Sequence, residues 1–195
     1  DEGWTLVVHL GMSGRLVYAP AGENCFGDCF GEHESTIPRH VHVVMTLDDG
    51  GLLYYHDLRQ FGYLTVCRTG EYAAIKGLQN LGPEPLGEEF KRETLEAALC
   101  GRKGRIKQLL LDQYLIAGIG NIYADESLFE AGIHPERTGD SLTQEEFGKL
   151  YQAIRQVLQK GIEHRGTSIT DYVDGEGQPG DFQNCLQVYR RTGQE

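Results

Sequence analysis

Long apolar runs are missing from this sequence, and so is a leader. No stretch approaches the ~18 consecutive apolar residues that a membrane-spanning helix needs, which excludes such a helix. The opening residues 1–4, Asp-Glu-Gly-Trp, lack the basic start and the apolar centre of a signal peptide. They also lack an initiating Met and look like part of a strand region. We therefore expect a cytoplasmic chain that is a fragment or a processed piece.

Cysteine is scarce and poorly spaced for cross-linking. The five cysteines are odd in number and scattered, which favours a reduced protein over a disulfide framework. Cys25 and Cys29 could supply half of a metal site, but no second closely spaced pair completes it. The sequence thus predicts no metal and no cofactor in this chain.

Positive charge is also in deficit. The formal net charge is −11 and the pI is near 5.1, which on its own argues against a nucleic-acid partner. The exception is "GRKGRIK" at 101–107, which carries four cations and no acid, and "YRR" at 189–191 adds two more. The sequence therefore leaves open the possibility of a local basic face on an acidic protein.

The first part of the chain has the composition of β-structure. Residues 4–18 and 40–67 are rich in Val, Leu, Tyr and Thr, which predicts antiparallel strands. "GMSG" at 11–14 and "DDGG" at 48–51 are typical of hairpin turns. Residues 20–38 are rich in Gly and Pro, which predicts a long loop.

The second part is helical and follows a Pro/Gly linker at 80–87, the best domain boundary. Thr143 and Glu146 have the spacing of a capping box at the start of a long amphipathic helix. After the long helix the sequence predicts a polar loop at 166–181 and a final strand or extended segment at 182–191. The fold class is α+β, and the predicted helices cover residues 88–100, 102–112, 121–131 and 143–165.

The segment "AGIGNIYADE" admits three interpretations. A dinucleotide-binding turn would need a third glycine where Tyr123 stands, and no alternating strand–helix pattern follows. A second possibility is a tight turn between helices with Asn121 as its N-cap. The third is a helix N-terminus that presents amides and Asn121 to a nucleic-acid phosphate, which the nearby cations of 101–107 favour.

Two turns carry apolar side chains where exposure is expected. Met12 lies between glycine and serine at one predicted hairpin tip, and Arg59 and Phe61 lie on another. Met12 and Phe61 could fold back onto the core. Alternatively they form a wedge that enters a base step, while the arginine fills the space of an expelled base.

Three histidines, His33, His40 and His42, lie close together in sequence. His40 and His42 are expected on one face of a strand, which permits metal or phosphate binding. Exposed strand histidines without function are the plainer alternative. A zinc hydrolase is disfavoured because no carboxylate has the spacing of a helical zinc motif.

Six segments, taken in order, resemble a known family: "HLGMSGRL", "DLRQFG", "LGPEPL", "GIGNIYADESLFEAGIHP", "GTSITDYV" and "LQVYRRTG". They are similar to bacterial formamidopyrimidine-DNA glycosylase, which excises oxidised purines such as 8-oxoguanine and nicks the abasic site. The resemblance implies an incomplete β-sandwich domain over 1–79 and a helix–two-turn–helix domain over 80–195. Its loop at 166–180 would close over the flipped base.

The resemblance also implies the residues that contact double-stranded DNA containing oxidised bases. Met12, Arg59 and Phe61 match the family's intercalating trio, with Arg59 facing the orphaned cytosine. The remaining DNA-binding residues carried over from the family are His9, His40, Lys103, Asn121 and Tyr123.

Departures from the family concern catalysis. The family's nucleophile is an N-terminal proline amine ahead of this chain's first residue, and its four-cysteine zinc finger would follow Glu195. Gln60 replaces a common arginine, and Arg190 replaces a usual glycine. We therefore expect a monomer from a glycosylase and AP lyase of base-excision repair, with no catalytic residue in this fragment. A non-enzymatic DNA-binding protein is the competing hypothesis.

Overall fold

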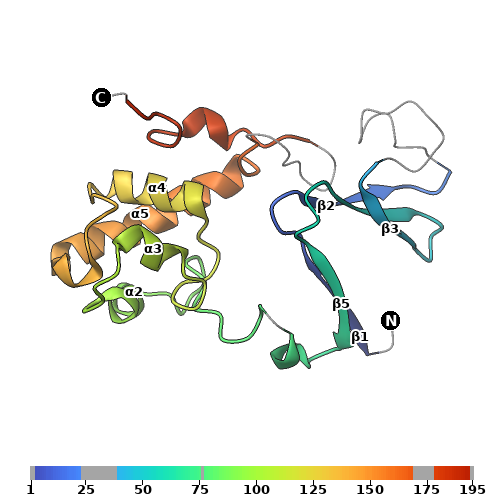
Figure 1. The fold of residues 1–195 in the computed structure, drawn as a ribbon, viewed down its shortest axis with the longest axis horizontal. Coiled ribbons are helices and arrows are strands. Elements are labelled where there is room, and N and C mark those ends of the chain that lie inside the picture. The colour runs from blue at the N-terminus through green and yellow to red at the C-terminus, as the bar shows by residue number, and fades with distance from the viewer. Residues whose placement is uncertain (1–2, 23–38, 76, 169–177, 194–195) are drawn as a thin grey trace. The chain divides into compact units, whose positions relative to one another are not determined.

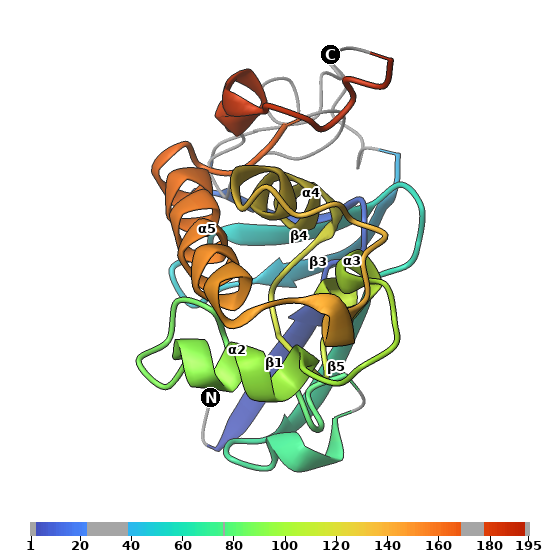
Figure 2. The same cartoon turned by 90° about the vertical axis from the view of Figure 1, so that its left-hand side faces the viewer.

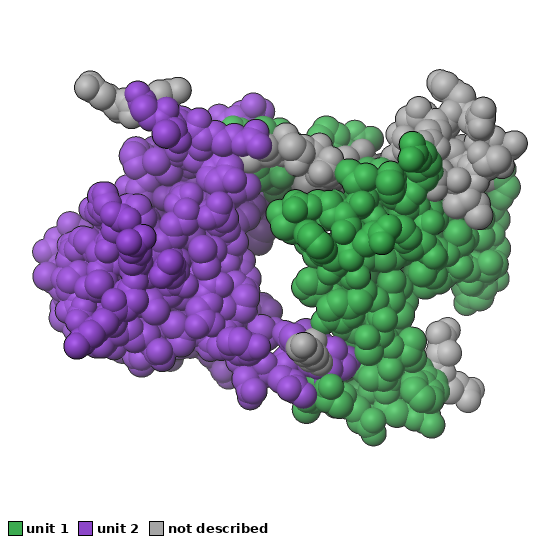
Figure 3. Space-filling view, in the orientation of Figure 1, with its two compact units in different colours: residues 1–74, 165–183 green, residues 75–164, 184–195 purple. Residues whose placement is uncertain are grey.

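The structure, a computed structural model, describes residues 3–22, 39–75, 77–168 and 178–193. The chain divides into two compact units, shown in Figure 3. Unit 1 comprises residues 1–74 with 165–183, and unit 2 comprises residues 75–164 with 184–195. The predicted domains 1–79 and 80–195 differ from these units mainly in where 165–183 is placed, and that domain division stays a prediction.

Unit 1 contains two antiparallel sheets (Figure 1). Strand β1 (Trp4–His9) pairs with β5 (Tyr63–Arg68), and their register joins His9 to Tyr63. The second sheet has the order β2-β4-β3. Its strands are β2 (Gly14–Ala19), β3 (Val41–Thr46) and β4 (Leu52–Asp57).

The predicted hairpin at 48–51 is confirmed, whereas the hairpin tips predicted at Met12 and at Arg59 and Phe61 are wrong. The turn at 48–51 joins β3 to β4, and Asp49 stabilises it by accepting the Gly51 amide at 2.8 Å. The turn at 10–13 instead leads from β1 in one sheet to β2 in the other. Residues 58–62 make the reverse passage from β4 to β5. Alternation of apolar and polar residues predicts a strand but not its partner, so the sequence could not show this change of sheet.

Unit 2 is built from four helices (Figure 2). They are α2 (Arg92–Leu99), α3 (Ile106–Leu111), α4 (Asn121–Glu130) and α5 (Gln144–Glu163). All four predicted helices are present, although α2 and α3 begin later than predicted. The antiparallel sheets first and the helices second confirm the predicted α+β class.

The core of unit 2 explains the helical periodicity. Fully buried side chains from all four helices meet there, including Leu95, Leu110, Leu128, Leu150 and Ile154. Of these, Leu150 and Ile154 lie on the buried face of α5, the helix whose amphipathic spacing the sequence predicts. Within the described ranges, no helix combines the length and apolar character needed to cross a membrane.

Two finer predictions concern the start of α5 and the segment 182–191 that follows it. The capping box of α5 is confirmed, because Thr143 Oγ1 accepts the Glu146 amide and Glu146 Oε2 accepts the Thr143 amide. The final strand predicted at 182–191 is wrong, since a 3-10 helix, η3 (Phe182–Cys185), and turns occupy this segment instead.

Candidate nucleic-acid interface

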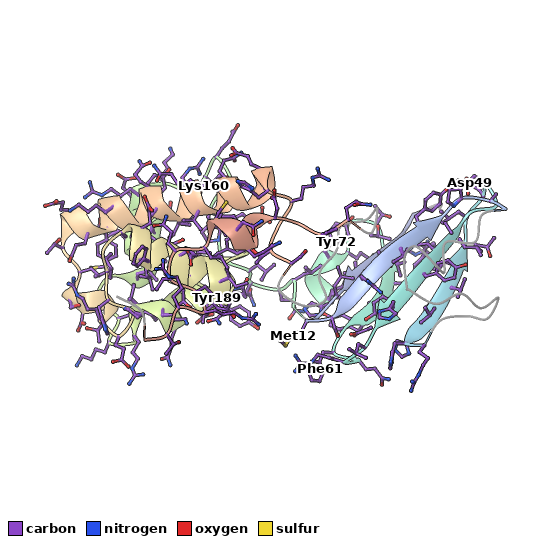
Figure 4. The ribbon with its side chains drawn as sticks, turned by 90° about the horizontal axis from the view of Figure 1, so that it is seen from above. Met12, Asp49, Phe61, Tyr72, Lys160 and Tyr189 are labelled. Atoms are coloured by element: carbon purple, nitrogen blue, oxygen red, sulfur yellow. The ribbon has the colours of Figure 1, made fainter. Side chains whose placement is uncertain are left out.

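Two loops of unit 1 lie side by side and carry three predicted site residues. Met12 lies on the loop 10–13, and Arg59 and Phe61 lie on the loop 58–62. The Met12 side chain is 72% exposed and the Phe61 side chain 59% exposed. Figure 4 shows both at the end of unit 1 opposite Asp49. The alternative that they fold back onto the core is therefore wrong.

The loops touch through their glycines. A side chain built on Gly11, whose φ is +62°, would begin 2.9 Å from the amide nitrogen of Gly62. A side chain on Gly62 would begin 2.1 Å from the hydroxyl of Tyr55 and 2.5 Å from the carbonyl of His9. Only glycine allows the two backbones to approach this closely.

Arg59 and Phe61 form a local pair on the second loop. The Arg59 guanidinium lies over the Phe61 ring, 5.1 Å from its centroid. Between them Gln60 adopts a left-handed backbone with φ of +57°. This reversal of the backbone accompanies a cation–π contact that keeps the guanidinium and the ring together.

His9 and His40 lie on the same unit in different settings. His9 ends β1 and stacks on Tyr63 of the paired strand, with ring centroids 5.0 Å apart. His40 precedes β3 with φ of +68°, so the prediction that His40 and His42 share a face of one strand is wrong. His42 instead uses Nε2 to donate to the carbonyl of Asp57 at 2.9 Å.

The N-terminus of α4 is the counterpart on unit 2. Gly120 is its N-cap and Asn121 is its first helical residue, so the interpretation of Asn121 as N-cap is wrong. Gln113 fixes the preceding turn by accepting the Gly118 amide at 2.8 Å and donating to the Ile119 carbonyl at 2.9 Å. In the described part of the chain no side chain caps α4, and Asn121 is exposed. Uncapped first-turn amides are suited to bind an anion.

Tyr123 has a packing role that its sequence position did not reveal. A side chain added at Gly161 of α5 would begin 2.6 Å from the Tyr123 ring. The ring therefore lies on α5 in the space that glycine leaves, and it packs against the core of unit 2. A contact between Tyr123 and DNA stays a prediction.

The basic segment 101–107 is less available than its sequence suggests. Arg105 pairs with Glu136 at 3.1 Å, and Lys107 pairs with Asp125 at 2.8 Å. Lys103 is exposed and makes no ion pair among the residues that the structure describes. Arg105 and Lys107 already have carboxylate partners, and Arg102 donates to the Ala98 carbonyl at 2.7 Å, so Lys103 is the strongest phosphate-binding candidate of this segment.

Two buried carboxylates were missed by sequence reasoning. Asp57 is 0% exposed and Glu126 is 4% exposed. Glu126 accepts three consecutive amides of residues 187–189 at 2.8 to 3.0 Å. Two signals in the sequence could have indicated their burial. Asp57 ends the apolar strand "LLYYHD", and Glu126 lies on the inner face of a helix.

Burial and hydrogen bonding have opposite effects on the pKa of the Asp57 carboxyl group. Burial alone would raise the pKa of its carboxyl group, but hydrogen bonds from Ser13, Gly62, Arg59 and Tyr55 outweigh it and lower the pKa to about 2. Asp57 is therefore ionised at neutral pH, and the charge is stabilised by donors rather than by a cation.

The described part of the chain offers no metal centre. No three His, Cys, Asp or Glu side chains within it lie close enough to hold an ion, so the zinc hydrolase gains no support. Cys25, Cys29 and His33 lie outside the described residues, as do much of the loop 20–38 and residues 169–177.

Comparisons with known proteins agree with this geometry. Residues 1–64 match the formamidopyrimidine-DNA glycosylase N-terminal domain, and residues 81–173 match the formamidopyrimidine-DNA glycosylase H2TH domain. The formamidopyrimidine-DNA glycosylase of Pelotomaculum thermopropionicum is 49% identical over 99% of this chain and 66% of its own length. That of Syntrophomonas wolfei is 48% identical over 100% of this chain and 67% of its own length.

Solved structures extend the likeness to three dimensions. The MutM (Fpg) protein of Thermus thermophilus is 40% identical with a TM-score of 0.83, covering 98% of this chain and 66% of that protein. The Lactococcus lactis Fpg in complex with an abasic site containing DNA is 34% identical with a TM-score of 0.82, over 98% and 66%. This chain thus spans about two thirds of the relatives' length, and it belongs to the formamidopyrimidine-DNA glycosylase family.

Proposed function

We propose that these 195 residues are the DNA-binding body of a base-excision repair glycosylase that removes oxidised purines and cleaves the abasic site. Its substrate would be double-stranded DNA containing 8-oxoguanine or formamidopyrimidines, bound by a monomer. Relatives of matching sequence carry the glycosylase name, and the Lactococcus lactis Fpg binds abasic-site DNA. Activity, substrate and partner are proposed here for a protein of the relatives' length.

The observation that carries the proposal is the exposed pair Met12 and Phe61. Each is a large apolar side chain on a loop of unit 1, at 72% and 59% exposure, and the Arg59 guanidinium lies over the Phe61 ring. Water opposes such exposure, and burial in a stacked duplex would reverse the cost. A base step opened by extrusion of the damaged nucleotide supplies an apolar gap of this kind.

Arg59 is suited to bind the unpaired base on the strand opposite the gap. Its fork of N–H donors can pair with the acceptors that an orphaned cytosine exposes, which gives selectivity for the opposing base. Phosphate contacts would come from His9 and His40 on unit 1, and from Lys103, Asn121 and the first amides of α4 on unit 2. Tyr123 keeps its predicted DNA contact as part of this proposal.

Catalysis on this proposal needs groups beyond the described site. The family's chemistry uses a proline amine to attack the sugar carbon and form a Schiff base, which we place outside these residues. A protein of these 195 residues alone is then expected not to excise 8-oxoguanine. Trapping with borohydride on a lesion-bearing duplex tests this, and a covalent protein–DNA adduct would show that the chain holds its own nucleophile.

Binding is tested by comparing two duplexes that differ at one position. One carries a stable abasic-site analogue and the other is intact, and fluorescence anisotropy gives both dissociation constants. We expect about tenfold tighter binding to the abasic duplex, equal to about 1.4 kcal/mol. Equal affinity for the two duplexes would reject the gap-filling role. In a protein of full relative length, abasic-site preference without base excision would favour the non-enzymatic DNA-binding alternative.

A further inference from the structure

Asp57 is the last residue of β4 and lies beneath both loops of the candidate interface. Its carboxylate receives four hydrogen bonds. Oδ1 accepts the Ser13 hydroxyl at 2.7 Å and the Arg59 amide at 3.2 Å. Oδ2 accepts the Gly62 amide at 2.8 Å and the Tyr55 hydroxyl at 3.3 Å. Three of these four donors, on Ser13, Arg59 and Gly62, belong to the two loops themselves.

The donors stand next to the side chains that the proposed function uses. Ser13 directly follows Met12, and Gly62 directly follows Phe61. Ser13 also accepts the Arg59 amide at 2.9 Å while it donates to Asp57. One carboxylate and one hydroxyl thereby tie the Met12 loop to the loop of Arg59 and Phe61.

The main chain of Asp57 extends the same connection to a third element. Its amide donates to the carbonyl of His40 at 2.9 Å, and its carbonyl accepts from His42 Nε2 at 2.9 Å. His40 is held with φ of +68°, a backbone conformation that the surrounding bonds must stabilise. Asp57 therefore contacts, through its bonds, every element of unit 1 that carries a predicted DNA residue except β1.

A buried negative charge is unexpected beneath a surface that must accept phosphates. It repels the phosphate backbone and costs desolvation, so direct participation in DNA binding is unfavourable. Four donors on a fully buried group serve geometry instead, because an ionised carboxylate accepts them all at once. An asparagine at this position would keep one acceptor oxygen, but its NH₂ group would face two of the donors and could accept from neither.

We propose that Asp57 is the positioning residue that sets Met12, Arg59 and Phe61 in the arrangement that fills the gap in damaged DNA. This inference rests on the proposed function, and it assigns to Asp57 no contact with DNA. Its effect passes through Ser13 and through the amides of Arg59 and Gly62.

The test uses Asp57→Asn in the 195-residue chain, with Asp49→Asn as a matched control. Asp49 also accepts a main-chain amide, from Gly51 at 2.8 Å, and a tyrosine hydroxyl, from Tyr18 at 3.0 Å. Figure 4 places Asp49 at the end of unit 1 opposite Met12 and Phe61. Both variants thus lose a structural carboxylate, but only one lies beneath the loops. Ser13→Ala replaces Asp57→Asn if that variant does not fold.

Two measurements are made on each variant. Anisotropy compares a duplex carrying an abasic-site analogue with an intact duplex, and hydrogen exchange follows the amides of Arg59 and Gly62. For Asp57→Asn we expect the preference for the abasic duplex to fall about tenfold. Binding to the intact duplex and its salt dependence should stay unchanged, while both amides exchange at least about tenfold faster. Asp49→Asn should match the wild type in both measurements.

Each result separates this inference from the proposed function. Equal weakening on both duplexes would show a merely structural role, and unchanged exchange at both amides would show that Asp57 does not order the loops; either overturns the inference. If the wild type itself does not prefer the abasic duplex, the proposed function fails and the DNA role of Asp57 fails with it. In that case faster exchange would still identify the loop contacts, so the two failures have different signatures.

Discussion

Truncation of Met12 and of Phe61 to alanine separates a recognition role from a packing role. The structure leaves only about a quarter of the Met12 side chain and two fifths of Phe61 covered, from exposures of 72% and 59%. Full burial of such a side chain is worth about 1.5–3 kcal/mol. We therefore expect Met12→Ala and Phe61→Ala each to lower the free energy of unfolding by about 0.5–1 kcal/mol. Core residues of this size would lose about 2–5 kcal/mol.

The stability assay is urea unfolding with a core control in the same unit. Val17, which is 2% exposed on β2, should lose about 2 kcal/mol on truncation to alanine. The binding assay compares the abasic-analogue duplex with the intact duplex. Because insertion into the gap recovers apolar burial that the free protein lacks, each truncation should weaken abasic-duplex binding about tenfold. Binding to the intact duplex should hardly change.

Either of two combinations of results would refute the reasoning. If both variants lose as much stability as Val17→Ala, and if they bind both duplexes more weakly in proportion, then Met12 and Phe61 are packing residues. Near-native stability with unchanged abasic-duplex affinity would also remove the wedge, because exposure without a binding effect leaves these side chains no role in the gap.

Four further expectations follow from the buried acids and the cations. Because the pKa of Asp57 is about 2 in the fold, its stabilisation should be lost as pH falls from about 4 to 2. Urea unfolding across that range should show the wild type losing about 2 kcal/mol more than Asp57→Asn. Glu126→Ala removes the buried acceptor of three main-chain amides and should cost about 3 kcal/mol by the same assay, a loss that a purely solvated carboxylate would not show. Arg59→Ala should reduce discrimination among bases opposite an abasic analogue by about 1–3 kcal/mol, and a uniform loss across all bases would assign Arg59 to the phosphates. Lys103→Ala should lower the slope of log affinity against log salt by about 0.9, whereas Lys107→Ala, whose ammonium is already paired, should change it less.

Local patterns in the sequence predicted the local structure well. The order of strands before helices, the turn at 48–51, the capping box of Thr143 and Glu146, and all four helices were confirmed. These features depend on neighbours within a few residues, so spacing and residue type suffice to find them. The sequence left open whether Met12 and Phe61 are exposed or fold back onto the core, and their exposed fractions in the structure show that they are exposed.

Features that depend on distant partners could not be predicted. Strand pairing between β1 and β5 joins residues about sixty positions apart, so two predicted hairpin tips proved to be passages between sheets. The basic segment 101–107 looked free because its partners, Asp125 and Glu136, lie well downstream. Asp57 was missed because an acid beside a turn is usually solvated, and nothing local signals four donors converging on it.

The change of sheet explains how apolar tips can be both exposed and ordered. A hairpin tip is held by its own two strands, whereas these two loops run between the sheets in opposite directions and meet where they cross. Gly11 and Gly62 allow the contact, and Asp57 supplies bonds to both loops from below. The order of the loops therefore comes from polar contacts and backbone fit, not from burial of Met12 or Phe61. Because the loop contacts and the exposed side chains involve different residues, Met12 and Phe61 can stay exposed without weakening the fold, as the proposed insertion into a gap in DNA requires.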